Sequence, residues 1–292
     1  MNALYLKITA VALMLASTTV FAGKSVDERW DIDADAMVSI ENIAGQIEVQ
    51  GWDRNEARLT GELGNSVEEL EVSASSSSLQ INVANRNERN VDNTELRLMI
   101  PKGASLDASA VSADIDVSGL DNEKLTASSV SGDVDVSASS NRVSIESVSG
   151  DVDFNGYTLR VSAESVSGDI VLSGVSGEVY ATTVSGDMEL KAGQIESGKI
   201  ETVSGDVTAS AEVSDNGKLG VESMSGDVII LLPASQSGVF KAESFSGRIT
   251  TDFGSVDRAK HGPGSYLKYV AGNGGAEIRI ESFSGNIKLK HD

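Results

Sequence analysis

The sequence predicts an all-β protein that folds as a single-chain β-solenoid, with short strands joined at glycine corners. Three observations predict this fold: a recurring Val-Ser-Gly-Asp motif, a nearly constant spacing of its glycine, and a period of two in the apolar residues between motifs. Strand-forming repeats of about 20 residues that each stack on the next are the sequence signature of a solenoid.

The motif recurs along most of the chain. Near-identical copies begin at Val130, Val148, Val166, Val184, Val203 and Met224, and degenerate copies begin at Ile43, Val111, Phe245 and Phe283. From Gly132 onward the motif glycine advances by 18, 18, 18, 19, 21, 21 and finally 38 residues. The last interval is close to two repeats, which predicts that one coil there has diverged.

Within a repeat, apolar residues alternate with polar ones, as in strands with one buried face. Val148, Val152 and Phe154 share one parity, and Asp151 and Asp153 share the other. Val143 and Ile145 have the parity opposite to Val148, which predicts a corner near Ser147. Two buried columns are therefore predicted, with equivalent side chains about 4.8 Å apart. The first contains Val130, Val148, Val166, Val184 and Val203, and the second contains Val134, Val152, Ile170, Met188 and Val207.

An antiparallel sandwich is the competing architecture, since strands at nine-residue spacing with turn signals also suit it. The solenoid is preferred because identical motifs recur in one phase, which a stack of hairpins does not require. A left-handed hexapeptide helix is disfavoured because Arg160 lies six residues after Phe154.

The chain divides into four predicted segments. Residues 1–22 resemble a secretory signal, with Lys7 before the apolar run Ile8 to Val20 and cleavage expected after Ala22. Residues 23–105 are expected to hold the first coils and a cap, 106–253 the regular solenoid, and 254–292 a loop, the last coil and a second cap. The signal predicts export, to the periplasm first, with an extracellular or cell-surface location as the alternative.

The amino-acid composition disfavours several classes of partner and of catalytic site. The net charge of -21 disfavours nucleic acid and anionic membranes as partners. The chain has no cysteine, and its two histidines, His261 and His291, lie in a loop and beside the terminus, where solvated side chains are expected. No catalytic residues and no cofactor are predicted, and the chain is expected not to be an enzyme.

Three consecutive repeats carry paired aspartates that should project outward. The pairs are Asp114 with Asp116, Asp133 with Asp135, and Asp151 with Asp153. Ca²⁺ could relieve their mutual repulsion, since it takes 6–8 oxygen ligands. The simpler interpretation is a solvated acidic face that discourages sheet pairing.

The ordered set of motifs resembles the bacterial putative-adhesin family of β-strand repeat proteins, a domain of unknown function. The resemblance rests on Gly51-Trp52-Asp53 after Ile47 and Val49, the run Ile100-Pro101-Lys102-Gly103-Ala104, and Gly272-Asn273-Gly274-Gly275-Ala276 before Ser284-Gly285. It covers nearly all of 30–290. It implies a right-handed β-helix similar to adhesin head domains, and it brings no catalytic or ligand residues.

Two hypotheses of function remain open. The first is an exported, non-catalytic protein with a structural or interaction role in the cell envelope, whose partner is an envelope protein or a glycan. The second is a carbohydrate-binding or carbohydrate-cleaving β-helix protein, in which Trp30, Trp52, Tyr157 or Tyr180 could stack on sugars. Trp52 is expected to serve packing at a corner instead.

Overall fold

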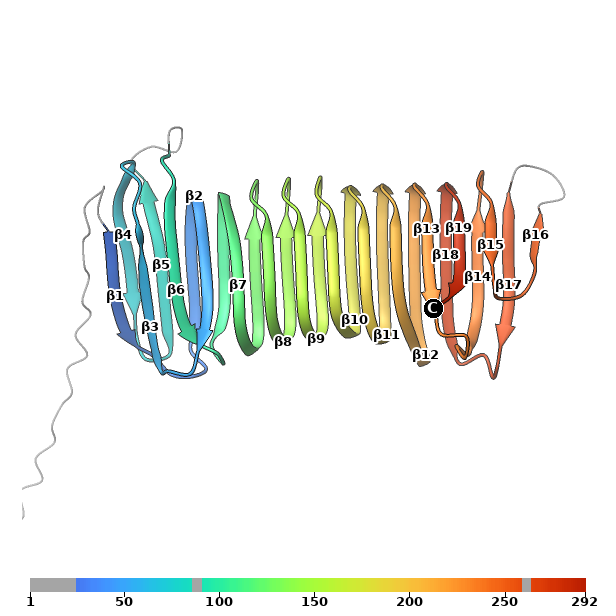
Figure 1. Cartoon of the computed structure of the whole chain (residues 1–292), viewed down its shortest axis with the longest axis horizontal. Coiled ribbons are helices and arrows are strands. Elements are labelled where there is room, and N and C mark those ends of the chain that lie inside the picture. The colour runs from blue at the N-terminus through green and yellow to red at the C-terminus, as the bar shows by residue number, and fades with distance from the viewer. Residues whose placement is uncertain (1–24, 86–90, 259–263) are drawn as a thin grey trace, which may run out of the picture.

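The computed structural model describes residues 25–85, 91–258 and 264–292, so the predicted signal segment and His261 lie outside the described part. Within these ranges every regular element is a strand, and the strands form an elongated two-layered rack (Figure 1). No helix of this described part could cross a bilayer.

Each regular coil is built by one long strand that bends in the middle. Strand β8 places Val134 and Val136 in the core, turns near Ser140, and then buries Val143 and Ile145 from the opposite layer. We call the segment before each Ser-Gly-Asp corner the pre-corner layer and the segment after it the post-corner layer. The central strands are β7 (Ser105–Ser129), β8 (Val134–Ser147), β9 (Val152–Ser165), β10 (Ile170–Ser185), β11 (Met188–Ser204) and β12 (Val207–Ser225).

Neighbouring coils pair in parallel, which confirms the solenoid and rules out the antiparallel sandwich for this region. Val134 pairs with Val152 and Ile145 pairs with Ala163, so the offset of 18 residues in the sequence becomes the register of the sheet. The predicted right-handed winding stays a prediction.

One predicted column is confirmed and the other is wrong. Val134, Val152, Ile170, Met188 and Val207 are at most 4% exposed. The residues of the first predicted column are instead between 43% and 48% exposed: Val130, Val148, Val166, Val184 and Val203. Because the chain leaves one layer and enters the other between Ser147 and Val152, the period of two cannot be counted across the corner.

The corner itself explains the motif. The Gly150 N–H donates to the buried Ser147 hydroxyl over 2.9 Å, so the serine rather than the valine occupies the inward position. A Cβ atom on Gly150 would lie 2.0 Å from the Gly132 carbonyl oxygen of the preceding coil. Glycine is required here because the backbones of successive coils approach closely.

The N-terminal end is closed by antiparallel strands. Strand β2 forms the first parallel coil against β7, while β5 and β6 extend its two layers. Strands β4, β3 and β1 then add in antiparallel fashion, so the end of the rack differs from its interior. The strands are β1 (Ser25–Asp31), β2 (Met37–Trp52), β3 (Glu56–Glu62), β4 (Val67–Ala74), β5 (Ser78–Asn85) and β6 (Thr94–Pro101).

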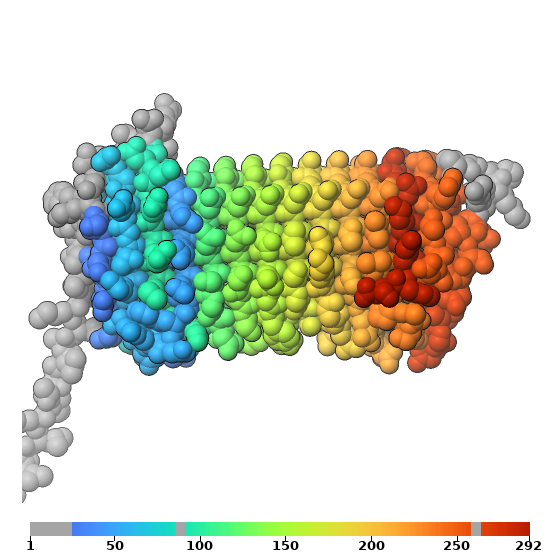
Figure 2. Space-filling view, viewed as in Figure 1, coloured from blue at the N-terminus to red at the C-terminus, as the bar shows by residue number. Residues whose placement is uncertain are grey.

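At the other end the spatial order departs from the chain order. The last coil, β18–β19, pairs with β12–β13 on one side and with β14–β15 on the other, while β17 and β16 form an antiparallel cap. The last coil therefore lies within the stack and not at its end: Figure 1 marks the C-terminus there, and Figure 2 shows dark-red surface atoms among the orange coils. The strands are β13 (Val228–Leu232), β14 (Gly238–Ser244), β15 (Ile249–Thr251), β16 (Val256–Arg258), β17 (Ser265–Ala271), β18 (Ala276–Ser284) and β19 (Ile287–His291).

The interval of 38 residues in the sequence thus contains an excursion to the cap and a return. Asp227 fixes the returning coil, because its Oδ1 accepts the Asn286 backbone N–H over 2.8 Å. This hydrogen bond and a second from the Asn286 side-chain amide, together with nearby Lys288, hold the pKa of Asp227 below its usual value. The predicted boundaries at 105 and 253 stay predictions.

Candidate functional site

An unbroken line of exposed apolar side chains runs along one corner of the rack. We call it the apolar ridge, and its members are 43–59% exposed: Val111, Val130, Val148, Val166, Val184, Val203, Met224, Phe283 and Phe245. Side chains grow larger toward the C-terminal coils, where Phe245 and Phe283 stack with ring centroids 4.9 Å apart. Contiguous exposed apolar surface of this kind is typical of an interaction site.

A second line of side chains follows the ridge on the outer face of the pre-corner layer. We call it the glutamate column, which consists of Glu146, Glu164, Glu201, Glu222, Glu281 and Glu243. Strand pairing places Glu201 beside Glu222 and Glu222 beside Glu281, with Thr182 as the one interruption between Glu164 and Glu201. The two lines thus present apolar and acidic groups in parallel.

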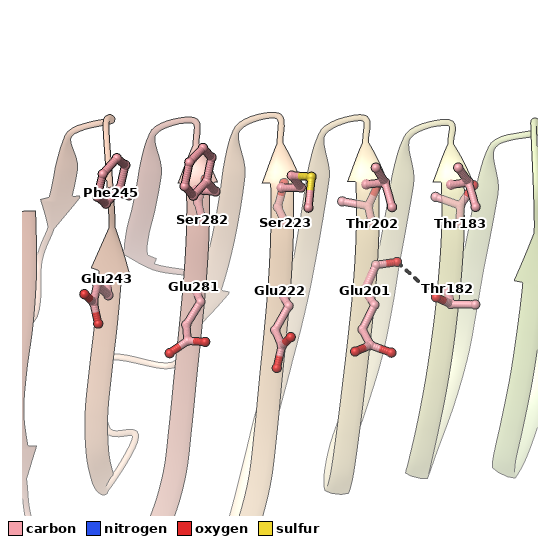
Figure 3. Close-up of a pocket in the computed structure, with 14 residues that line it drawn as sticks. Thr182, Thr183, Glu201, Thr202, Glu222, Ser223, Glu243, Phe245, Glu281 and Ser282 are labelled. Carbon is pink, nitrogen blue, oxygen red and sulfur yellow. Dashed lines mark hydrogen bonds between the residues drawn. The ribbon is translucent and has the colours of Figure 1, made fainter. Parts of the chain in front are cut away.

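An open groove of about 680 Å³ lies between the two lines in the C-terminal coils (Figure 3). Met224, Phe283 and Phe245 contribute one wall, and Glu222 and Glu243 contribute the other. The groove spans five neighbouring coils, from Thr182 to Glu243. At about 4.8 Å per coil, it is roughly 19 Å long.

Four of the five coils that form the groove have a different corner. Strands β8 and β9 end at the inward serine, whereas β10, β11, β12 and β18 continue two residues further. Gly205 and Gly226 there have φ values of 147° and 143°, and their N–H groups donate to the carbonyls of Ser225 and Ser284. The ridge residues of these coils therefore belong to the strand, beside the glutamate column.

This change of corner leaves two hydroxyls unpaired. Thr202 and Ser223 occupy the position of Ser147, are 5% and 6% exposed, and have no hydrogen-bond partner among the described residues. Both line the groove. An unsatisfied buried hydroxyl costs about 1–3 kcal/mol, so a bound molecule that reached these oxygens would recover part of that cost.

The structure separates the six predicted aspartates into two columns. Asp114, Asp133 and Asp151 stabilise the corners, because each Oδ1 accepts the N–H of the equivalent residue in the next coil over 2.9–3.1 Å. Asp116, Asp135 and Asp153 stand beside one another on the post-corner layer. Among the described residues, no three His, Cys, Asp or Glu side chains are placed to hold one metal ion.

Asp135 lies between Asp116 and Asp153 in the second column. Partial burial, followed by the charges of Asp116, Asp153, Asp133 and Asp114, raises its pKa. A carboxyl whose folded-state pKa is raised favours the folded state below its ordinary pKa, and that contribution is lost as pH rises through the raised pKa.

We therefore expect Asp135→Asn to raise the melting temperature at pH 7 by about 1–2 °C. The gain should vanish near pH 3, where the carboxyl is protonated in both states. Melting followed by circular dichroism from pH 3 to pH 8 measures it. Asp107→Asn, on an exposed aspartate outside the column, is the control and should show no comparable gain.

Calcium binding by these aspartates stays a prediction with a direct test. If the Asp116, Asp135 and Asp153 column holds Ca²⁺, millimolar Ca²⁺ should raise the melting temperature through linkage. NaCl of matched ionic strength is the control for screening. An equal shift in both salts, or a Ca²⁺ effect that survives Asp116→Asn with Asp153→Asn, would remove the hypothesis.

The remaining predicted residues are dispersed. Trp52 is half-buried beside a turn, where its Nε1–H donates to the Glu56 carbonyl over 2.7 Å and Arg54 lies over its ring. Trp30 packs against the core. Tyr157 is 52% exposed, and His291 meets the Phe253 ring edge-on.

Comparison with known proteins supplies the family. The model of the family described as Toastrack DUF4097 matches residues 28–290. The chain belongs to this family. A search of curated proteins finds no match. The predicted resemblance to a putative-adhesin domain of unknown function is thereby confirmed, and the two-layered rack described above is the fold of this Toastrack chain.

Solved structures similar to this Toastrack chain include two from Bacteroidetes. A putative adhesin from Bacteroides fragilis is 13% identical, with a TM-score of 0.45, over 91% of this chain and 97% of the other. A putative adhesin from Parabacteroides distasonis is 12% identical, with a TM-score of 0.40, over 91% and 97%. A putative cell adhesion protein from Clostridium sporogenes is 12% identical, with a TM-score of 0.24, over 92% and 100%.

The ridge and groove were missed by the sequence prediction, although a signal for them exists. A serine or threonine directly precedes each ridge residue from Val130 onward, as in Ser147-Val148 and Thr202-Val203. The hydroxyl side chain takes the inward position, which forces the following apolar side chain outward. The longer intervals of 19 and 21 residues mark the coils that form the groove.

Proposed function

We propose that this Toastrack chain is an exported, non-catalytic protein with an interaction role in the bacterial cell envelope. The apolar ridge supports the proposal most strongly, because nine exposed apolar side chains in register are surface that the fold itself does not use. The predicted signal over 1–22 supports export. The groove supports binding, since its described lining sets exposed apolar side chains beside carboxylates and hydroxyls.

Two measurements test this role. The chain without residues 1–22, used as bait on the envelope fraction, should capture a partner, and replacing Val184 and Val203 by Ser should reduce capture. Cell fractionation with N-terminal sequencing should find the chain outside the cytosol, beginning at Gly23. A cytosolic chain that retains Met1, or polysaccharide turnover that persists through purification, would contradict the proposal.

Carbohydrate binding is the second candidate, and Tyr157 favours it. This half-exposed ring lies beside Asn155 and Asp121 in a shallow depression away from the ridge, an arrangement that could stack on a sugar and bond its hydroxyls. A glycan array should then show binding that Tyr157→Ala abolishes. Binding that is unchanged in this variant would place any sugar site elsewhere.

A further inference from the structure

The groove combines two kinds of wall that select for the same type of ligand. On one side, Met224, Phe283 and Phe245 expose apolar surface without any covering element. On the other side, four of the five coils carry a carboxylate, as Figure 3 shows for Glu201, Glu222, Glu281 and Glu243. A ligand that fills the groove must bury apolar groups and bring positive charge at the same time.

Part of the acidic wall is already neutralised, and part is not. Lys199 donates to Glu201 over 2.7 Å, and Arg279 pairs with Glu281. Within the described ranges, Glu222 and Glu243 have no ion-pair partner, and both are exposed. Two carboxylates without an ion pair therefore lie beside the largest apolar side chains of the ridge, two residues before Met224 and Phe245 in the chain.

We propose that the groove binds a cationic, amphipathic peptide segment of a partner protein. Lysine or arginine side chains of the segment pair with Glu222 and Glu243, and its large apolar side chains cover Met224, Phe283 and Phe245. The proposal rests on the interaction role proposed above and names the chemistry of the partner.

The length of the groove favours a helical peptide segment. A groove of roughly 19 Å accommodates about 13 residues of α-helix at 1.5 Å per residue. Glu222 and Glu243 lie two coils apart, about 9.6 Å, with the paired Glu281 between them. Basic residues two helical turns apart, about 10.8 Å, would therefore meet these two carboxylates. Helix-in-groove recognition uses apolar anchors of this spacing.

Charge disfavours the other occupants. A second copy of this chain, which carries a net charge of -21, would bring further negative charge to the glutamate column. Anionic lipid headgroups and nucleic acids would meet the same repulsion. A neutral acyl chain would cover the apolar wall and leave Glu222 and Glu243 without partners.

The test uses a fluorescent synthetic peptide of about 14 residues in which leucines form one helical face and lysines flank it. Fluorescence anisotropy at physiological salt should show binding to the chain without residues 1–22. Replacing the leucines by serine, or the lysines by glutamate, should abolish binding, because each change removes one of the two complementary features. Equal binding of the lysine–serine peptide would overturn the proposal.

Variants locate the site. Glu222→Gln with Glu243→Gln should weaken binding about tenfold, as should Met224→Ser with Phe283→Ser. Glu62→Gln with Glu95→Gln makes the same change of net charge at the N-terminal end, and Met37→Ser with Leu159→Ser removes exposed apolar surface away from the ridge. Neither control should weaken binding. All four residues changed in the groove are exposed, so melting temperatures should stay near that of the unmodified chain.

Two outcomes would overturn the assignment of the groove. One is a loss of affinity in the charge control equal to that in the groove variant, which indicates general attraction to an acidic protein. The other is capture of an envelope partner that the groove variants leave unchanged. In that case the interaction role would stand and only the proposed occupant of the groove would fall.

Discussion

Gly168→Ala is expected to destabilise the protein by about 3 kcal/mol or more, the upper range for inserting an atom into a close-packed site. The added Cβ would lie 2.0 Å from the Gly150 carbonyl oxygen and 2.6 Å from its carbon. Both are backbone atoms of the adjacent coil, so no side-chain rotation can relieve the contact. The coils would have to separate, which would break the hydrogen bond from the Asp169 N–H to Asp151.

The midpoint of urea unfolding measures this effect, with Gly220→Ala as the matched control. A Cβ on Gly220 would come no closer than 3.9 Å to another residue, the carbonyl oxygen of Gly198. Alanine there should be neutral or slightly stabilising, since glycine in a strand carries an entropic cost. Equal behaviour of the two variants would contradict the close approach of the coils at Gly168.

Phe154→Ala is expected to cost about 3–5 kcal/mol, which is typical of a large-to-small change in a packed core. Phe154 is fully buried on the inner face of the post-corner layer. Val136 lies beside it in the preceding coil and Leu172 in the following coil. Both neighbours are held by strand pairing, so they cannot close the cavity that the missing ring leaves.

Val148→Ala is the informative comparison, because simple alternation placed Val148 in the same core. At 43% exposure it should cost no more than about 0.5 kcal/mol, as is usual at a surface position. Thermal melting of both variants under one buffer condition decides between the two predictions. A large loss of stability in Val148→Ala would restore the inward orientation that alternation alone suggested.

The recurring motif was sufficient to predict the architecture of the fold. Copies such as Val130-Ser131-Gly132-Asp133 and Val148-Ser149-Gly150-Asp151 differ so little that each must meet the same environment, which only a parallel stack supplies. The inward positions of Val134 and Val152 also followed, because they lie within a strand where alternation holds. The corner near Ser147 was predicted from the change of parity before it.

The site could not be predicted in the same way. The outward orientation of Val148 is set at the corner between the two layers, where the buried Ser147 hydroxyl accepts the Gly150 N–H. The roles of the aspartates diverge for a similar reason. Asp133 accepts an N–H from the next coil, whereas Asp135, two residues later, faces like charges and has a raised pKa.

The sequence alone determined that this chain is a stack of parallel coils, because a repeated local pattern imposes a repeated local structure and its register. Only the tertiary structure decided which coils are neighbours at the C-terminal end, where β18–β19 returns between β12–β13 and β14–β15. That return brings Met224, Phe283 and Phe245 together along one groove. These partners are far apart in the chain, and a local repeat fixes the structure of each coil but not which distant coil it pairs with.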